Sequence, residues 1–155
     1  MMQSDTSDLI KQYLAQQHMM QLATMRGEQP WICTVYFVID DTYNLYWASL
    51  PSRRHSQEIA EHANVAAAVP VNFVKGEPVA GLQIEGTAEI LQPAEMHRPI
   101  AQRYAEKFGR DDTWVDDITT GRTQHRLYKL TPAQYVLFDE VHFAGDQARQ
   151  EITDL

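Results

Sequence analysis

The sequence predicts a mainly β fold, a small six-stranded antiparallel barrel with peripheral helices. Segments with strand periodicity and short turns dominate the early part of the chain, and segments with helical spacing are inserted later. Strands joined by such short hairpins favour an antiparallel sheet. At 155 residues the chain is long enough for one domain with a real core and too short for two comfortable ones. We therefore expect residues 1–155 to form a single domain.

The strands are predicted from apolar or alternating runs that are bounded by Gly, Pro, Asn and Asp. Seven runs qualify, and we expect them to form about six strands of a barrel. They cover residues 18–25, 31–40, 45–49, 64–71, 81–91, 126–131 and 134–140. The run over residues 81–91 alternates most clearly between apolar and polar side chains. Gly86 in its middle predicts a bulge or a close backbone contact.

Three helices are predicted from apolar residues that recur at helical spacing. They cover residues 6–17, 53–62 and 93–109, and the last is opened by Pro93 and closed by Gly109. The acidic segment 110–121 is expected to be irregular. Residues 1–5 are expected to be a mobile tail, whereas the polar residues 145–155 either move freely or cross to a partner.

The strand over residues 31–40 is apolar on both of its faces. One face carries Trp31, Cys33, Val35 and Phe37, and the other carries Ile32, Tyr36 and Val38. A strand with one face in water would alternate with polar residues. This strand needs cover from the barrel interior on one side and from a helix, a second subunit or a flat ligand on the other. Because one small barrel with three helices cannot cover so much apolar surface, we expect a homodimer.

A basic cluster follows the short apolar strand 45–49. The chain turns through a Pro–Ser corner into a helix, and Ser52 is expected to be the N-cap of that helix. Arg53, Arg54 and His55 would then occupy the first turn, where the positive macrodipole makes a cation cost about 0.3–1 kcal/mol. The misfit disappears if an anion sits there, because helix amides and guanidinium groups together form a phosphate site. The alternative is a solvated basic turn that pairs with acidic neighbours.

The overall charge and the lone cysteine limit the partners and the location. A formal net charge of −8 argues against nucleic acid or an anionic membrane as a partner, because both require a basic face. No apolar run reaches membrane-spanning length, and the acidic N-terminus does not resemble a secretory signal. A single cysteine, Cys33, excludes an internal disulfide and fits a reducing compartment, so we expect a cytoplasmic protein.

The sequence lacks the usual motifs for metal or hydrolytic chemistry. Its six histidines form no helical i,i+4 pair with an acid nearby, and it has no Cys-x-x-Cys, so we expect no metal site. It also has no Gly-x-Ser-x-Gly and no Walker loop, which argues against a hydrolase or a P-loop enzyme. Ser49 has no base nearby in the sequence and is expected to contact phosphate rather than to act as a nucleophile.

Several short motifs occur in the order that is found in one known family. They are Leu22-Ala23-Thr24, Pro30 through Val38, Leu45-Tyr46-Trp47-Ala48-Ser49, Arg53-Arg54-His55 leading to Ile59, and Gly81 through Ala88. On these motifs the chain resembles the pyridoxamine 5′-phosphate oxidase-like family, the FMN-binding split barrels, from about Leu22 to Glu140. The resemblance implies a six-stranded antiparallel split β-barrel that binds FMN.

The resemblance also implies a set of cofactor-binding residues. In that family a Thr or Ser at the strand end and an Arg–Lys pair in the next turn hold the flavin phosphate, and these roles fall on Ser49, Arg54 and His55. The ring system lies against the strand at residues 34–36, and Trp47 and Ala48 flank the ring or the ribityl chain. The expected cofactor-binding residues are Thr34, Val35, Tyr36, Trp47, Ala48, Ser49, Arg53, Arg54 and His55.

Two departures from the family pattern limit the prediction. His55 stands where a Lys is common, and the C-terminal Arg-x-x-Pro signature of the true vitamin B6 oxidases is absent. We therefore expect a relative of the oxidase rather than the oxidase itself. The leading hypothesis is an FMN-dependent oxidoreductase that acts on a small molecule, with the flavin at a homodimer interface. The alternative is a non-catalytic binder of flavin or haem, with His125 or His142 as the axial ligand, and a deazaflavin in place of FMN also stays open.

Overall fold

The computed structural model describes residues 2–155, and for residues 2–4 only the backbone. The helices are α1 (Met2–Gln16), α2 (Arg54–Glu61), α3 (Arg98–Phe108) and α4 (Asp112–Thr120), with short 3₁₀ turns η1 (Glu95–His97) and η2 (Gly145–Ala148). The strands are β1 (Met19–Arg26), β2 (Gln29–Tyr36), β3 (Val38–Ile39), β4 (Leu45–Ser49), β5 (Asn64–Asn72), β6 (Ala80–Leu91), β7 (Arg126–Asp139) and β8 (Arg149–Ile152).

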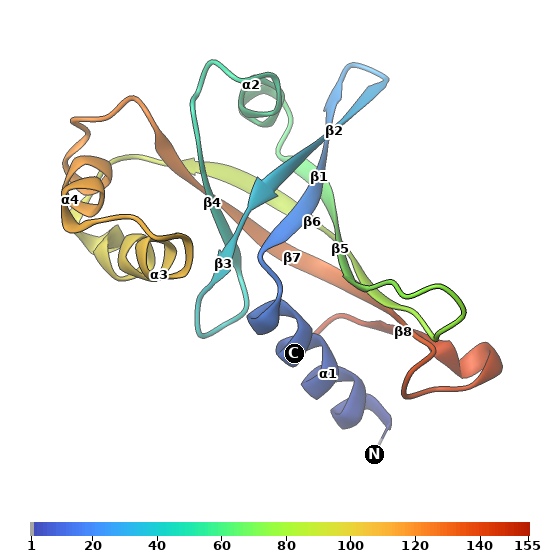
Figure 1. The fold of residues 1–155 in the computed structure, drawn as a ribbon. Coiled ribbons are helices and arrows are strands. Elements are labelled where there is room, and N and C mark those ends of the chain that lie inside the picture. Colours follow the sequence, from blue (N-terminus) through green and yellow to red (C-terminus); the bar gives the residue numbers. More distant parts are fainter. Residues whose placement is uncertain (1) are drawn as a thin grey trace.

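The eight strands of the described residues form one antiparallel sheet. Their order is β2-β1-β5-β6-β7-β4-β3, and β8 pairs with the C-terminal part of β7. The strands β2 and β3 follow each other in the chain but lie at opposite edges of the sheet, so the chain crosses between the edges at Phe37. The sheet therefore curls until its two edges approach each other, which gives the split barrel of Figure 1.

The side chain of Lys107 in α3 holds this crossing in place. Its Nζ donates hydrogen bonds to the backbone oxygens of Gln17 and Phe37. The amide of Phe37 in turn donates to the backbone oxygen of His18 at 3.1 Å. Burial lowers the pKa of the Lys107 ammonium. The two carbonyl oxygens compensate part of that burial, and the end of β2 is thereby fixed against α3.

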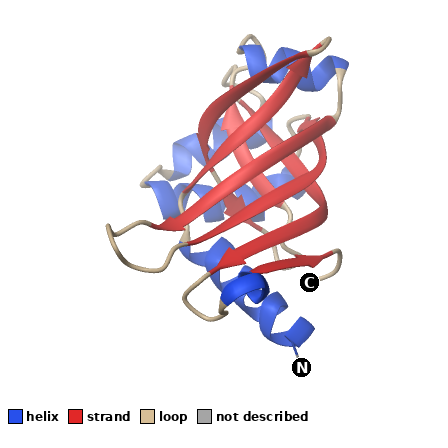
Figure 2. Cartoon of the chain, turned by 90° about the vertical axis from the view of Figure 1, so that its right-hand side faces the viewer, coloured by secondary structure: helices blue, strands red, loops and turns tan. Residues whose placement is uncertain are grey.

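The main core fills the inside of the curled sheet. The large side chains that are almost fully buried there are Trp47, Tyr128, Phe37, Ile10, Leu14, Met20, Leu22, Leu45, Leu82, Leu130 and Leu137. Each contributes roughly 1.5–3 kcal/mol relative to an exposed side chain. Helix α1 covers one end of the barrel with Ile10 and Leu14, and α2 covers the opposite end with Ile59 (Figure 1). Figure 2 shows the long strands side by side, with helices behind them and at both ends of the sheet.

Strand β4 is buried on both faces. Trp47 points into the barrel and stacks on Tyr128, with ring centroids 5.6 Å apart. Tyr46 points the other way, into a second core that α3 and α4 form with residues such as Ile100 and Val115. Because both faces are packed, the last residue of the strand, Ser49, has a fixed position.

The structure corrects the predicted number of strands from six to eight. The run over residues 31–40 is divided at Phe37, because β2 pairs with β1 while β3 pairs with β4. The runs over residues 126–131 and 134–140 form the single strand β7. The register with β6 shifts between Glu85 and Gly86, so the bulge lies in β7 at Ala133, opposite this pair. A Cβ atom on Gly86 would lie 2.2 Å from the backbone oxygen of Thr131, which confirms the predicted close contact.

The predicted tails are also corrected. Residues 2–5 belong to α1, and Met1 lies outside the described residues. Residues 149–152 form β8, which pairs with β7 of the same chain, and Ala148 and Ile152 are buried. Strand pairing with β7 and the burial of Ala148 and Ile152 therefore attach the C-terminal part of the chain to the sheet.

Two helix predictions need correction as well. The acidic segment expected to be irregular contains α4, because the Asp111 side chain accepts a hydrogen bond from the amide of Trp114 at 2.9 Å and so caps the helix. Helix α3 begins at Arg98 rather than at Pro93, since η1 intervenes, and it ends at Gly109 as predicted.

Candidate functional site

The end of β4 and the start of α2 bring three polar side chains together. The strand ends at Ser49, and a tight turn leads to Arg53, which is the N-cap residue of α2. The predicted N-cap, Ser52, lies one residue too early, because the extended backbone that precedes the helix is that of Arg53 (φ −68°, ψ 149°). Among the described residues, no side-chain hydrogen bond caps the start of this helix. The first amides therefore lack a side-chain acceptor, which favours a bound anion.

His55 is held against the end of β4. Its Nε2 atom lies 2.9 Å from the Ser49 hydroxyl, and both side chains are buried. Burial, together with the positive charge of Arg53, lowers the pKa of His55 below its ordinary value, although Glu58 acts in the opposite direction. The imidazole is therefore neutral at neutral pH, and an anion placed beside it would favour its protonation.

A cavity of about 370 Å³ opens beside this corner. Its lining residues are Met19, Thr34, Val35, Tyr36, Ala48, Ser49, Leu50, Arg53, His55, Tyr104 and His125. The volume falls in the range of roughly 300–1,000 Å³ that is typical of small-molecule sites. The cavity combines basic groups from the start of α2 with a row of side chains from β2, so it offers both an anion contact and an extended wall.

Seven of the nine residues predicted to bind a cofactor line this cavity, and two do not. Trp47 is fully buried inside the barrel. Arg54 is directed elsewhere: its Nε donates to Glu58 at 3.2 Å, and its guanidinium carbon lies 4.2 Å from the centre of the Trp31 ring. The adjacent residues Arg53 and Arg54 therefore have different surroundings.

Four residues line the cavity that were not among the predicted cofactor-binding residues, although His125 was named as a possible haem ligand. They are Met19, Leu50, Tyr104 and His125. Tyr104 lies in α3 and stacks on Trp114 of α4, with ring centroids 5.1 Å apart. The helical spacing around Tyr104 predicts that it is buried, but not which strand it faces. No local pattern marks His125, which reaches the cavity only because β7 pairs with β4.

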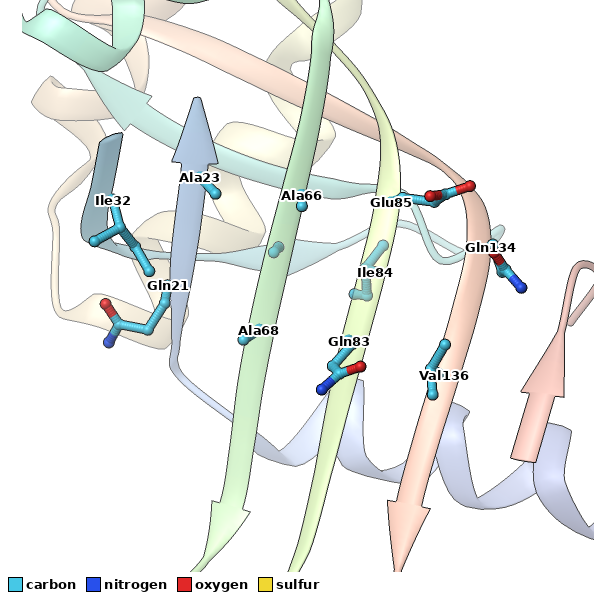
Figure 3. Close-up of a pocket in the computed structure, with 11 residues that line it drawn as sticks. Gln21, Ala23, Ile32, Ala66, Ala68, Gln83, Ile84, Glu85, Gln134 and Val136 are labelled. Atoms are coloured by element: carbon cyan, nitrogen blue, oxygen red, sulfur yellow. The ribbon is translucent and has the colours of Figure 1, made fainter. Parts of the chain in front are cut away.

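A second hollow, of about 380 Å³, lies on the outer face of the sheet (Figure 3). Its lining residues are Gln21, Ala23, Ile32, Ala66, Ala67, Ala68, Gln83, Ile84, Glu85, Gln134 and Val136. Neighbouring strands place the short side chains of Ala23, Ala66 and Ala68 beside the longer Gln21 and Gln83 (Figure 3). None of the lining residues is a cation, so this hollow suits an anionic cofactor less well than the cavity beside α2.

A buried acid lies at the far end of β7. Asp139 is fully buried and accepts hydrogen bonds from the Tyr13 hydroxyl at 2.7 Å and from His142, whose Nδ1 is 2.8 Å away. The backbone amides of Val141 and His142 also donate to it. Burial alone would raise the pKa of Asp139, but these hydrogen bonds outweigh it and hold the pKa below its ordinary value. His142 is thus engaged within the chain and does not line the cavity.

Other candidate reactive groups offer less. Burial, with a smaller effect of Glu58, raises the pKa of the Cys33 thiol to about 11, so the thiol stays protonated and packs against the core. Among the described residues, no three metal-binding side chains gather in one place. None of the described helices is long and apolar enough to cross a membrane.

Comparison with known proteins gives one family. The family model described as pyridoxamine 5′-phosphate oxidase matches residues 6–138, a range that contains the whole cavity. A UPF0306 protein of Klebsiella pneumoniae is 30% identical over 110 residues, which covers 67% of this chain and 71% of that protein.

Two examples show which solved structures share the fold. A FAD-binding protein from Mesorhizobium loti superposes with a TM-score of 0.65 at 17% identity, over 81% of this chain and 88% of that one. HutZ, the heme storage protein from Vibrio cholerae, also gives a TM-score of 0.65 at 17% identity and the same coverage. At this identity the likeness shows the fold alone, and the same scaffold therefore occurs in proteins named for two different planar ligands.

Proposed function

The chain belongs to the pyridoxamine 5′-phosphate oxidase family, and from that premise we propose that it binds FMN in the cavity beside α2 and acts as a flavin-dependent oxidoreductase. The observation that carries the proposal is the convergence of Ser49, Arg53 and His55 at a cavity whose other wall is β2. A phosphate monoester matches this corner, because it takes charge-assisted hydrogen bonds from a guanidinium group and from free helix amides.

The rest of the cavity fits the remainder of the cofactor. Thr34, Val35 and Tyr36 lie one after another along β2, which offers a flat ring both backbone groups and an aromatic edge. Tyr36 is half exposed and is itself supported by Phe108, with ring centroids 4.8 Å apart. A bound flavin would supply the hydride or electron transfer, while these residues orient it and limit the access of water. Tyr104 and His125 lie where a small-molecule substrate would contact the protein.

We also propose that the protein is a homodimer and that the second copy covers the outer face of β2. Ile32 and Tyr36, which share that face, are 60% and 49% exposed, a large apolar surface for one face of a strand. The Thr34 hydroxyl donates to Gln21 at 2.8 Å, and this contact joins the rim of the cavity to the outer hollow. A subunit that covers the outer face would therefore also close the cavity. A cytoplasmic location stays a prediction from the single cysteine.

One observation favours a second candidate, a haem-binding protein. His125 is exposed and lines the cavity, so its imidazole could serve as an axial ligand for an iron porphyrin, whereas His142 is held by Asp139. The named heme storage relative of the same fold makes this worth testing. FMN stays the first proposal, because a porphyrin would leave the buried pair of His55 and Ser49 without a function.

The visible absorption spectrum of the freshly purified protein tests both candidates. Flavin gives bands in the blue and near-ultraviolet, whereas haem gives a Soret band. If the protein is colourless, titration with FMN and with haem decides, and His125→Ala with His142→Ala as its control identifies a haem ligand. Sedimentation of the FMN complex should give twice the chain mass. Haem binding that excludes FMN, or a monomer that carries flavin, would contradict the proposal or its dimer.

A further inference from the structure

A second buried acid lies in α2, three residues after His55. Glu58 of α2 is only 2% exposed, and one of its carboxylate oxygens accepts from the Thr24 hydroxyl of β1 at 3.1 Å. Its other oxygen accepts from Nε of Arg54 at 3.2 Å. Burying a carboxylate is costly unless it is paired and hydrogen-bonded. Losing either contact would leave a buried carboxylate short of a partner, so the two contacts stabilise the position of α2 against β1.

The contact closes into a ring of four residues. The guanidinium group of Arg54 lies 4.2 Å from the centre of the Trp31 ring, and Trp31 faces Thr24 across the β1–β2 ladder. The path thus runs from Glu58 to Thr24, across the ladder to Trp31, and back through Arg54 to the same helix. We call Thr24, Trp31, Arg54 and Glu58 the α2 clamp.

We propose that the α2 clamp positions the first turn of α2, so that Arg53 and His55 face the cavity while Arg54 is a positioning residue and not a phosphate ligand. The inference rests on the proposed function, since the ligand it serves is the FMN phosphate. It assigns opposite roles to two adjacent arginines. Arg53 supplies the charge at the cavity, and Arg54 ties the turn to the β1–β2 hairpin.

The geometry gives the reason for this division. Arg54 already satisfies a buried carboxylate on one side and covers an aromatic face on the other, and its side chain is only 32% exposed. Its Nε cannot turn towards a ligand without leaving Glu58 uncompensated, and Arg54 is not among the residues that line the cavity. Arg53, by contrast, is exposed and lines the cavity. Because Glu58 and Trp31 hold the guanidinium group of Arg54, the backbone at Arg54 has little freedom to move. The orientation of its neighbours Arg53 and His55 is restricted with it.

The first test uses Thr24, which is buried on β1 and is not among the residues that line the cavity. Thr24→Val keeps the shape and the strand preference but removes the hydrogen bond to Glu58. We expect FMN affinity to fall about five- to tenfold, by the loss of one well-placed charge-assisted contact, while riboflavin affinity changes less than about twofold. Thr24→Ser keeps the hydroxyl and should restore the FMN preference. A normal FMN preference in Thr24→Val would overturn the proposal.

The second test uses Glu58, because the two possible roles of Arg54 predict opposite signs. If Glu58 holds Arg54 as part of the clamp, Glu58→Gln loosens the turn and weakens FMN binding. If Arg54 is instead a phosphate ligand that Glu58 restrains, the same change frees the guanidinium group and tightens FMN binding. Tighter or unchanged FMN binding in Glu58→Gln would therefore overturn the clamp.

A third measurement does not depend on flavin and separates the clamp from the proposed function. The imidazole NMR signals of His55 report its contact with Ser49 in the free protein. Thr24→Val changes no charge, so a shift of these signals, reversed in Thr24→Ser, supports the clamp even if the wild type binds no FMN. Unchanged His55 signals in Thr24→Val would count against the clamp, whatever the cofactor is.

Discussion

A histidine lies close to a hydroxyl group at each end of β7, but the charged groups around the two histidines differ. Near its first residue, Arg126, which pairs with Ser49, a histidine and a hydroxyl meet at the cavity beside α2. After its last residue, Asp139, a histidine and a hydroxyl meet at a buried carboxylate. The first group combines His55 with a neutral hydroxyl and a nearby cation, and the second combines His142 with an anion that belongs to the chain.

The difference shows how the same residue types become a binding site or a structural contact. Asp139 receives four hydrogen bonds from within the chain, so the second group is complete. In the first group burial lowers the pKa of His55 most, Arg53 adds to this effect and Glu58 opposes it. Among the described residues, no carboxylate is hydrogen-bonded to the imidazole. An external anion would complete the first group. The three predictions below compare the two groups, from the largest expected effect to the smallest.

Replacing the buried acid should affect stability and leave the cavity unchanged. In Asp139→Asn the Tyr13 hydroxyl and two amides lose an ionised acceptor, so we expect a loss of about 3 kcal/mol, or a melting temperature about 6–12 °C lower at pH 7. The folded-state pKa of Asp139 is depressed, so its contribution is present above the unfolded pKa of about 3.9 and is lost as the pH falls through the folded value. The difference from wild type should therefore shrink in acid.

Thermal unfolding from pH 7 down to pH 3 measures this, with Tyr13→Phe as the matched control that removes one donor only. FMN affinity at pH 7, measured well below the melting temperature, should equal that of the wild type. A weaker FMN affinity in Asp139→Asn would mean that the two ends of β7 are coupled.

The histidine at the cavity should make FMN binding depend on pH. In the free protein the pKa of His55 is lowered, and a phosphate dianion beside it would favour the imidazolium, so a proton is taken up on binding. Affinity should therefore rise about tenfold from pH 8 to pH 6, where protonation of the phosphate itself limits the gain. Fluorescence titrations of FMN over this range measure the slope.

Two variants separate the proton from the contact. His55→Gln should bind weakly with a flat profile, and His55→Lys should bind tightly with a flat profile. If the wild type and His55→Gln share one profile, His55 does not contact the phosphate.

The histidine at the other end of β7 should matter least. His142 has a side chain that is 48% exposed, and Asp139 keeps its bonds to Tyr13 and to the backbone amides when the imidazole is removed. His142→Ala should therefore cost no more than about 1 kcal/mol of unfolding free energy. The pH profile of FMN binding should match that of the wild type. A changed profile would locate the titrating group at the wrong end of the strand.

Features that depend on local pattern could be predicted from the sequence. The bounds of β4, the alternation of β6, the glycine that ends α3 and the close contact at Gly86 all follow from side-chain period and backbone sterics over a few residues. The basic turn after β4 was visible for the same reason, since cations in a first helical turn conflict with the macrodipole.

Only the tertiary structure decided which of the clustered side chains face the cavity. Arg53 and Arg54 are equivalent in any local pattern, and they differ because Arg54 meets Glu58 and Trp31 while the extended backbone of Arg53 leads its side chain to the cavity. Tyr104 and His125 join the site through helix packing and strand pairing across long sequence separations. The physical reason is that hydrophobic period and secondary-structure propensity act over a few neighbouring residues. The direction of a side chain also depends on distant residues, which pair with buried charges and pack against apolar surface.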